Sequence, residues 1–300
     1  MKTKKLPKLI VIIGPTASGK TDLSVEIAKK VKGEIISADS RQIYKYLDVG
    51  SGKVTKKEMR GVTHYCLDIF EPGKTKSITD YLKYANKAIK EIIAKGKTPI
   101  ICGGTGFYID GILYGIPKNA KPNKKLRNEL EKEELKSLLT RIKKLNKEKY
   151  LELTNNENTS ERNNKRRLIR IIEILEAKKA EADVVEISQL NKKIKYDVEY
   201  VFIDITKEKL RERINLRLER RLEAKGKNNL INEVKFLRDK LKISDEWLLS
   251  LGLEYKYVTM YLKGDLNYEE MKEQLGNKIW QFAKRQITWN KRYYKAAGQK

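Results

Sequence analysis

Gly14-Pro15-Thr16-Ala17-Ser18-Gly19-Lys20-Thr21 is the stretch that decides the fold, because its spacing matches the phosphate-binding loop G-x-x-x-x-G-K-[ST]. The apolar, β-branched run over residues 9–13 predicts a buried strand before the loop, and Asp22 begins a pattern typical of a helix after it. Such a unit aims backbone N–H groups and the positive end of a helix dipole at an anion. We therefore expect the loop to bind a phosphorylated ligand, with Lys20 neutralising phosphate charge and the Thr21 hydroxyl on a magnesium ion.

Two further segments are expected at the same edge of the sheet. A second short strand over residues 34–37 runs into Asp39, and a third buried strand opens into the glycine-rich stretch 103–106. Ligands bind at the carboxyl ends of strands in an open parallel sheet, so Asp39 should lie beside the phosphate loop. A carboxylate there can act as a general base or share in metal binding, while Ser40 and Gln42 can hydrogen-bond a polar ring.

The chain changes character at Pro117 and again at Asp197. Residues 118–196 carry almost no glycine or strand-like alternation, whereas a strand returns over 197–205. The expected helices span residues 124–147 and 164–177 in the middle, then about 207–225, 228–242, 245–263 and 268–292. We predict an α/β fold with a parallel sheet core like that of P-loop NTPases (1–117 and 197–300), a helical C-terminal region and an inserted all-helical subdomain (118–196). A single continuous domain with surface helices is the alternative.

Composition limits the function classes. The chain has 300 residues, 40% of them hydrophobic, and no apolar run of about 18 residues that would span a membrane. Residues 1–5 lack the features of a secretory signal. Cys66 and Cys102, both expected in buried strands, form neither a disulfide framework nor a zinc site with the single histidine. These features fit a reducing cytoplasm, and nothing in the sequence demands more than a monomer.

The net charge of +26 is large for this length and is spread along the chain. A basic protein attracts nucleic-acid phosphates through counterion release. The composition is equally compatible with biased codon usage in a Lys-, Ile- and Asn-rich protein, so charge alone leaves the partner open.

Together the motifs resemble those of the tRNA dimethylallyltransferases, also called tRNA isopentenyltransferases. The resemblance runs from residue 9 to about 293 and keeps the family's order. It rests on GPTASGKT, ADSRQIYKYLDVGSGK, HYCLDI, GGTGFYIDGIL, Asn164–Arg170, Ile214–Arg217 and Ala283–Trp289. A lone phosphate loop would fit many enzymes, but this loop followed by DSRQ-x-Y and GGTG-F-Y is specific.

The resemblance implies a mechanism and a set of site residues. Dimethylallyl diphosphate would be held by the phosphate loop, Mg²⁺ and Arg217, and a flipped-out adenosine next to the anticodon would attack its allylic carbon. Asp39, Thr16 and Arg217 would be the catalytic residues, with Asp39 taking the proton from N6. The anticodon arm of tRNA would contact Asp39, Ser40, Arg41, Gln42, Thr105, Arg127, Arg166, Arg167, Leu168, Ile169 and Arg170. The diphosphate would contact Gly14, Pro15, Thr16, Ala17, Ser18, Gly19, Lys20 and Thr21.

Other functions stay open on the residues alone. The first is a small-molecule kinase that uses ATP, with Asp204 as a second metal-site aspartate. The second is a non-catalytic RNA-binding module, for which the basic composition would suffice. A nearer variant is prenylation of free adenine nucleotides, against which the basic insertion argues.

Overall fold

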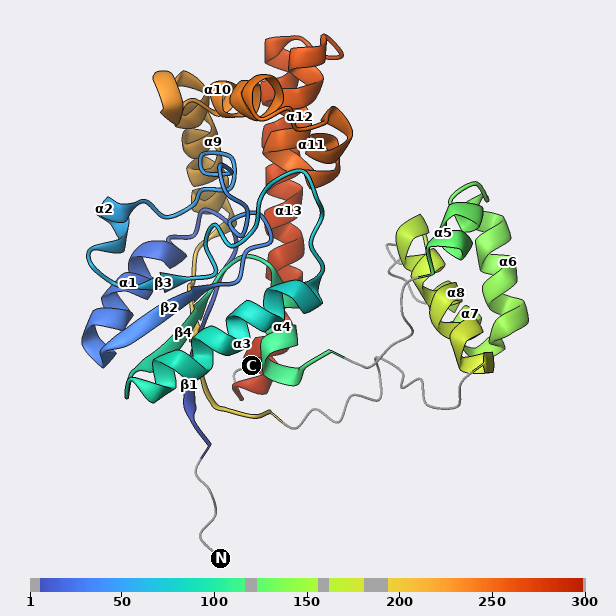
Figure 1. The fold of residues 1–300 in the computed structure, drawn as a ribbon, viewed down its shortest axis with the longest axis horizontal. Helices are drawn as coiled ribbons and strands as arrows, with labels where there is room; N and C mark the ends of the chain where they lie inside the picture. The colour runs from blue at the N-terminus through green and yellow to red at the C-terminus, as the bar shows by residue number, and fades with distance from the viewer. Residues whose placement is uncertain (1–5, 117–122, 156–161, 181–193, 299–300) are drawn as a thin grey trace, which may run out of the picture. The chain divides into compact units, whose positions relative to one another are not determined.

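The computed structural model describes residues 6–116, 123–155, 162–180 and 194–298 (Figure 1). The chain forms two compact units, which we call the core unit (Met1–Gly115 with Lys193–Lys300) and the helical unit (Ile116–Lys192). The expected boundary at residues 117–118 lies outside the described residues, and the strand expected from residue 197 begins at Asp197.

A parallel five-stranded sheet lies at the centre of the core unit, in the order β3-β2-β4-β1-β5. The strands are β1 (Lys8–Ile13), β2 (Gly33–Ser37), β3 (His64–Tyr65), β4 (Thr98–Cys102) and β5 (Asp197–Phe202). The helices between them are α1 (Lys20–Val31), α2 (Lys56–Met59), α3 (Ile78–Ala94) and α4 (Gly106–Tyr114). The predicted α/β fold with a parallel sheet is thus confirmed.

The central strands β1 and β4 are mostly apolar and buried, as is typical of a parallel sheet covered by helices. Ile10 and Ile12 of β1 pack with Ile35 of β2, Ile100 of β4 and Val25 of α1, all of them buried. This core fixes the carboxyl ends of β1, β2 and β4 side by side. The phosphate loop, the Asp39 segment and the glycine-rich stretch therefore open at one edge, as expected from sequence.

Gly103 shows how tightly the ends of β2 and β4 are joined. The Ala38 amide donates to the Cys102 carbonyl at 2.8 Å, and the Thr105 amide donates to the Ala38 carbonyl at 3.0 Å. A Cβ at Gly103 would lie 2.3 Å from the Ala38 carbonyl carbon. Only glycine permits this approach of two backbones.

The C-terminal part of the core unit is helical, as predicted. It contains α9 (Lys207–Glu223), α10 (Leu230–Lys235), a π-helical turn (Phe236–Lys240), α11 (Asp245–Leu251), α12 (Leu253–Lys263) and α13 (Tyr268–Ala296). The single helix expected over residues 245–263 is wrong, because Gly252 adopts φ 76° and separates α11 from α12. Helices α9 and α13 pack against each other, which Figure 1 also shows.

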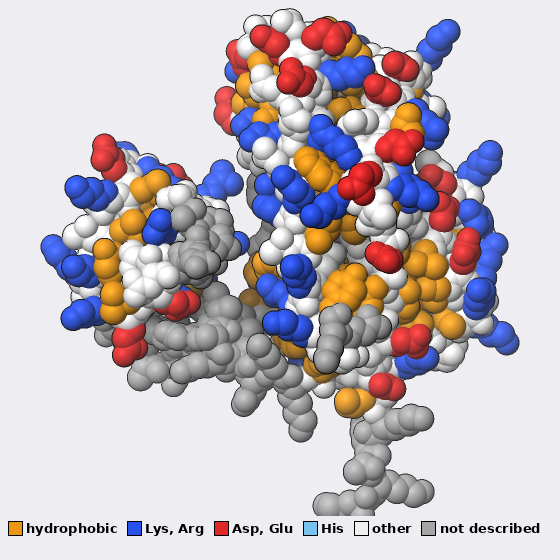
Figure 2. All heavy atoms as spheres, turned by 180° about the vertical axis from the view of Figure 1, so that it is seen from behind, with side chains coloured by type: hydrophobic (Ala, Val, Ile, Leu, Met, Phe, Trp, Pro, Cys, Tyr) orange, Lys and Arg blue, Asp and Glu red, His pale blue; other side chains and the backbone are white. Residues whose placement is uncertain are grey.

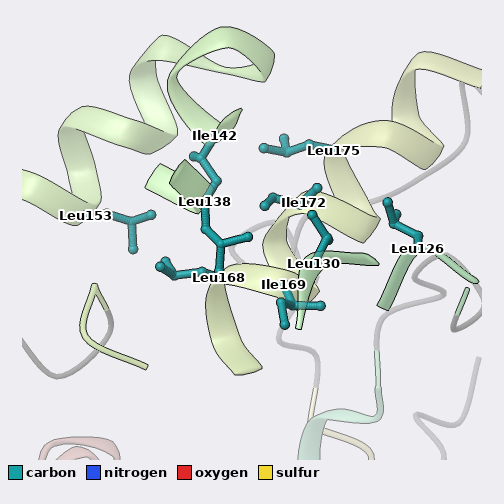
Figure 3. Packing of buried hydrophobic residues seen from close by; sticks show 9 residues of the cluster. All are labelled: Leu126, Leu130, Leu138, Ile142, Leu153, Leu168, Ile169, Ile172 and Leu175. Carbon is teal, nitrogen blue, oxygen red and sulfur yellow. The ribbon is translucent and has the colours of Figure 1, made fainter. Parts of the chain in front are cut away.

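The helical unit contains α5 (Lys124–Leu130), α6 (Leu135–Leu145), α7 (Lys147–Asn155) and α8 (Lys165–Ala180). The one helix expected over residues 124–147 is therefore two helices, with α6 ended by the extended backbone of Asn146. All four helices contribute to one apolar core (Figure 3), formed by Leu126, Leu130, Leu138, Ile142, Leu153, Leu168, Ile169, Ile172 and Leu175. This unit has its own buried core, as a separately folding subdomain requires.

Both cysteines are predicted in buried strands, and the structure differs from this prediction for one of them. Cys102 is the last residue of β4, but Cys66 follows β3 with φ 63° instead of lying in a strand. Both are free thiols, and burial raises the pKa of Cys66 to about 12. Within the described residues, no helix has the length and apolar character to cross a membrane.

Candidate active site at the carboxyl edge of the sheet

The phosphate loop is shaped by two residues in the left-handed region, Ala17 (φ 61°) and Gly19 (φ 97°), with Gly19 immediately before α1. The Ser18 hydroxyl is buried, and no described residue hydrogen-bonds it. A buried hydroxyl without a partner carries a free-energy penalty that a ligand oxygen can remove. The loop residues predicted from sequence therefore form a cradle with an unsatisfied donor, which suits an anion.

Lys20 is the first residue of α1, and its side chain folds back over the loop. Its Nζ donates to the Pro15 carbonyl at 2.6 Å. Burial lowers the pKa of Lys20 to about 8, and the positive charge of Arg217 acts in the same direction, while Asp39 opposes it. The charged lysine thus lacks a full counter-charge in the protein alone, and a diphosphate would supply one.

Arg217 reaches the loop from α9, where the buried face formed by Leu210, Ile214 and Leu218 fixes the helix orientation. Its Nη2 donates to Thr16 Oγ1 at 2.7 Å. Burial lowers the pKa of Arg217 to about 10, and Arg221 contributes, so the guanidinium is still charged at neutral pH. The arginine predicted to contact diphosphate is therefore placed beside the phosphate loop.

Sequence reasoning missed two other arginines of α9. Arg213 Nη1 donates to the Ser18 carbonyl at 3.0 Å, and Arg221 Nη1 donates to the Gly50 carbonyl at 3.4 Å and lies 3.3 Å from Glu254. Arg213, Arg217 and Arg221 are four residues apart, a spacing that places side chains on one helix face. That spacing is the signal that could have identified them.

The Asp39 carboxylate, just after β2, is held by the backbone amides of the residues that follow it. Its Oδ1 accepts from the Arg41 amide at 2.8 Å and from the Gln42 amide at 3.4 Å. No hydrogen bond from a described residue reaches Oδ2, which points toward Gly104. One oxygen thus fixes the carboxylate, and the other is available to accept a proton.

The residues around Asp39 differ in what their side chains do. Thr105 Oγ1 accepts from the Ser40 amide at 3.0 Å, which ties the ends of β2 and β4 together. Gln42 Nε2 donates to the Gly52 carbonyl at 3.2 Å, and the Arg41 side chain donates to the carbonyl of Leu251, the last residue of α11. These contacts shape the wall of the site. To contact RNA through their side chains, Arg41 and Gln42 would have to give up their hydrogen bonds to the Leu251 and Gly52 carbonyls.

Gln286 lies on α13, within the stretch Ala283–Trp289 on which the family resemblance partly rests. Its Oε1 accepts from the Thr16 amide at 2.7 Å, and its Nε2 donates to the Gly104 carbonyl at 2.8 Å. The side chain is buried. Because Thr16 is 270 positions away in sequence, no local pattern could have shown this contact.

Apart from Arg41, the arginines expected to contact tRNA lie in the helical unit. Arg127 donates through Nε and Nη2 to both oxygens of Glu173, at 2.7 and 2.8 Å, and Arg170 donates to the same carboxylate at 3.1 Å. Although burial opposes it, hydrogen bonds from Arg127 and the Asn123 amide hold the pKa of Glu173 below its ordinary value. Arg127 and Arg170 therefore each form an ion pair with Glu173. The side chains of Arg166 and Arg167 are exposed.

The resemblance also implies tRNA contacts by Leu168 and Ile169, and these two residues are buried. Both side chains lie in the core of the helical unit, with 0% and 3% of their surface exposed. Leu168 and Ile169 lie on the apolar face of α8, and the neighbouring arginines lie on its polar face. A contact of this segment with tRNA therefore stays a prediction for its backbone and for the arginines beside it.

Basic side chains are spread over the visible surface (Figure 2), as the even spread of charge along the sequence predicts. Figure 2 shows Lys and Arg side chains over the visible face of each unit, interspersed with Asp and Glu. Asp204, the second aspartate offered for the kinase alternative, is an exposed residue after β5. Within the described part of the chain, no cluster of three or more His, Cys, Asp or Glu side chains could hold a metal ion by itself.

Comparison with known proteins gives one consistent family. A sequence profile described as IPP transferase matches residues 42–293. The chain is 38% identical to a tRNA dimethylallyltransferase of Clostridioides difficile, over 97% of this chain and 90% of that protein. It is also 38% identical to a tRNA dimethylallyltransferase of Staphylococcus epidermidis, over 95% and 84% of the two chains.

Solved structures agree with this. The fold is similar to the tRNA isopentenylpyrophosphate transferase of Bacillus halodurans, with a TM-score of 0.66 and 31% identity over 95% of this chain and 86% of that one. A eukaryotic dimethylallyltransferase crystallised acting on tRNA has a TM-score of 0.76 at 24% identity, covering 95% of this chain and 70% of that one, which shows a shared fold.

Proposed function

The chain belongs to the IPP transferase family, and from that premise we propose that it transfers a dimethylallyl group from dimethylallyl diphosphate to N6 of the adenosine that follows the anticodon in tRNA. One observation carries the proposal. The phosphate loop with Lys20 and Arg217, and the carboxylate of Asp39, open at the same sheet edge on either side of Gln286. Transfer of a group from a diphosphate to an amine needs both a cationic cradle and a nearby base.

The diphosphate half of the reaction would be served by the phosphate loop. Lys20, Arg217 and the Ser18 hydroxyl supply donors that can stabilise the charge that develops on the leaving diphosphate. Mg²⁺ suits this site, because it takes few protein ligands and binds mainly to phosphate oxygens and water. The Thr21 hydroxyl would be its protein ligand. When bound, it would neutralise part of the leaving-group charge.

The adenosine half would be served by Asp39. The N6 lone pair forms a bond to the allylic carbon, the bond from that carbon to the diphosphate oxygen breaks, and N6 loses a proton. Asp39 Oδ2 would accept that proton, while Oδ1 keeps the carboxylate in place through the Arg41 and Gln42 amides. Thr105 and Ser40, joined at 3.0 Å, would line the position of the base.

The helical unit would bind the anticodon arm. Support comes from the exposed Arg166 and Arg167 on α8 and from the net charge of +26. Phosphate contacts of this kind supply affinity without sequence specificity. We further propose that the enzyme acts as a monomer, since one chain supplies both halves of the site, and that it works in the cytoplasm, which its two free cysteines fit.

The test is an incubation of the protein with labelled dimethylallyl diphosphate, Mg²⁺ and total tRNA, followed by nucleoside analysis. Prenylated adenosine in tRNA and stoichiometric release of diphosphate are expected. Label in free adenine nucleotides only would favour the nucleotide-prenylating variant, and release of ADP from ATP would favour a kinase. Binding of tRNA without any of these products would leave only the RNA-binding module.

A further inference from the structure

We propose that Gln286 is a positioning residue, which sets the spacing between the diphosphate half and the adenosine half of the site. The inference rests on the proposed function and concerns how that reaction is aligned. The hydrogen bonds of Gln286 go to the Thr16 amide and the Gly104 carbonyl, and not to the side chains of Lys20, Arg217 or Asp39. Gln286 acts through the phosphate loop and the loop after β4.

The contacts of Gln286 join three segments that are distant in sequence. Its amide oxygen binds the Thr16 amide of the phosphate loop, and its amide nitrogen binds the Gly104 carbonyl of the loop after β4. Thr16 is in turn bound by Arg217 through its hydroxyl at 2.7 Å. One side chain therefore connects the cationic cradle with the loop that carries Thr105.

Gln286 is also close to the proposed base. The point where a Cβ on Gly104 would lie is 2.6 Å from Gln286 Nε2 and 3.6 Å from Asp39 Oδ2. The two side chains therefore flank the same glycine. A shift of the amide would move the phosphate loop relative to Asp39.

This spacing matters for the chemistry. The allylic carbon must come within about 3–3.5 Å of N6 for the displacement, and a misplacement of about 1 Å can lower the rate about 100-fold. The Ser40 and Thr105 contacts join the loops after β2 and β4, and the Gln286 amide joins the phosphate loop to the loop after β4. Gln286 is therefore placed to hold the gap between the two halves constant.

The amide is suited to this role because it donates and accepts at once. A methionine would match its length and lose both hydrogen bonds. A glutamate could still accept from the Thr16 amide, but it would repel the Gly104 carbonyl and bring negative charge to the diphosphate. The two substitutions should therefore differ in their effect on diphosphate binding.

The experiment measures kcat and KM for both substrates in the full-length wild type, Gln286→Met and Gln286→Glu. Gln281→Met, at an exposed position of the same helix, is the matched control. We expect Gln286→Met to lower kcat about 10- to 100-fold, with the KM for tRNA within about threefold of wild type. Gln286→Glu should in addition raise the KM for dimethylallyl diphosphate, and the control should behave as wild type.

A second perturbation keeps the inference testable if Gln286→Met does not fold. Gly104→Ala places a Cβ 2.6 Å from the amide nitrogen and should displace the amide with Gln286 unchanged. It should lower kcat in the same range, and in the double variant the two losses should not add, because both act on one contact.

Two results would overturn the inference. One is a kcat within about twofold of wild type in folded Gln286→Met or, if that variant is unfolded, in Gly104→Ala. The other is a loss confined to the KM for tRNA, which would make Gln286 an RNA contact. A wild-type protein that transfers no dimethylallyl group would instead overturn the proposed function, so the two failures are distinguishable.

Discussion

Raising the pH through about 8 is expected to weaken the binding of dimethylallyl diphosphate. Burial lowers the pKa of Lys20 from 10.5 to about 8, so the empty loop loses this positive charge in a range where most lysines keep theirs. If only the charged form grips diphosphate, the affinity falls tenfold per pH unit above the pKa. Between pH values of about 7 and about 9.5 the loss is about 30-fold, equivalent to about 2 kcal/mol.

Folding stability should change in the opposite direction. The unfolded chain keeps the Lys20 proton up to a pKa near 10.5, whereas the folded chain releases it near 8. Between these values the unfolded state binds more protons, so the Lys20 contribution to stability rises with pH. Weaker binding above pH 8 would therefore not reflect unfolding caused by this lysine.

The assay is calorimetric titration of dimethylallyl diphosphate into the enzyme at constant ionic strength and Mg²⁺ across this pH range. Lys20→Arg is the matched control, because a guanidinium stays charged throughout. Its affinity should show no break near pH 8. A wild-type affinity that is flat from about pH 7 to 9.5, or that falls in parallel with the variant, would refute the reasoning.

Three further predictions follow from the site and its scaffold. Asp39→Asn should lower the transfer rate by about 100- to 10,000-fold with tRNA affinity within a few-fold, measured by single-turnover kinetics and filter binding; wild-type turnover would exclude Asp39 as the base. Arg217→Ala should raise the KM for dimethylallyl diphosphate by about 10- to 100-fold and leave tRNA binding intact, and loss of tRNA binding alone would assign that arginine to the RNA surface. Joint replacement of the exposed Arg166 and Arg167 by alanine should reduce the slope of log affinity against log salt by up to about two, and an unchanged slope in a folded variant would argue against the helical unit as the RNA clamp.

Several features of this protein could be predicted from sequence because they depend on short stretches of chain. The phosphate loop needs only a strand, eight residues and a helix start, so the segment Gly14–Thr21 and the placement of Lys20 were readable locally. The apolar strands predicted a covered parallel sheet, and the rule for strand ends placed Asp39 at the right edge. Helix breaks were missed where one or two residues decide them, as at Gly252.

Other features were decided only by the tertiary structure, because they join residues that no pattern connects. Gln286 hydrogen-bonds Thr16 across the site. The arginines spaced four residues apart on α9 reach the phosphate loop only because that helix packs over it. On α8 the same run of residues supplies buried Leu168 and Ile169 and exposed Arg166, and Arg170 is bound to Glu173. A family motif marks such a run as a whole, whereas burial and hydrogen bonding in the folded chain determine which of its side chains can reach a ligand.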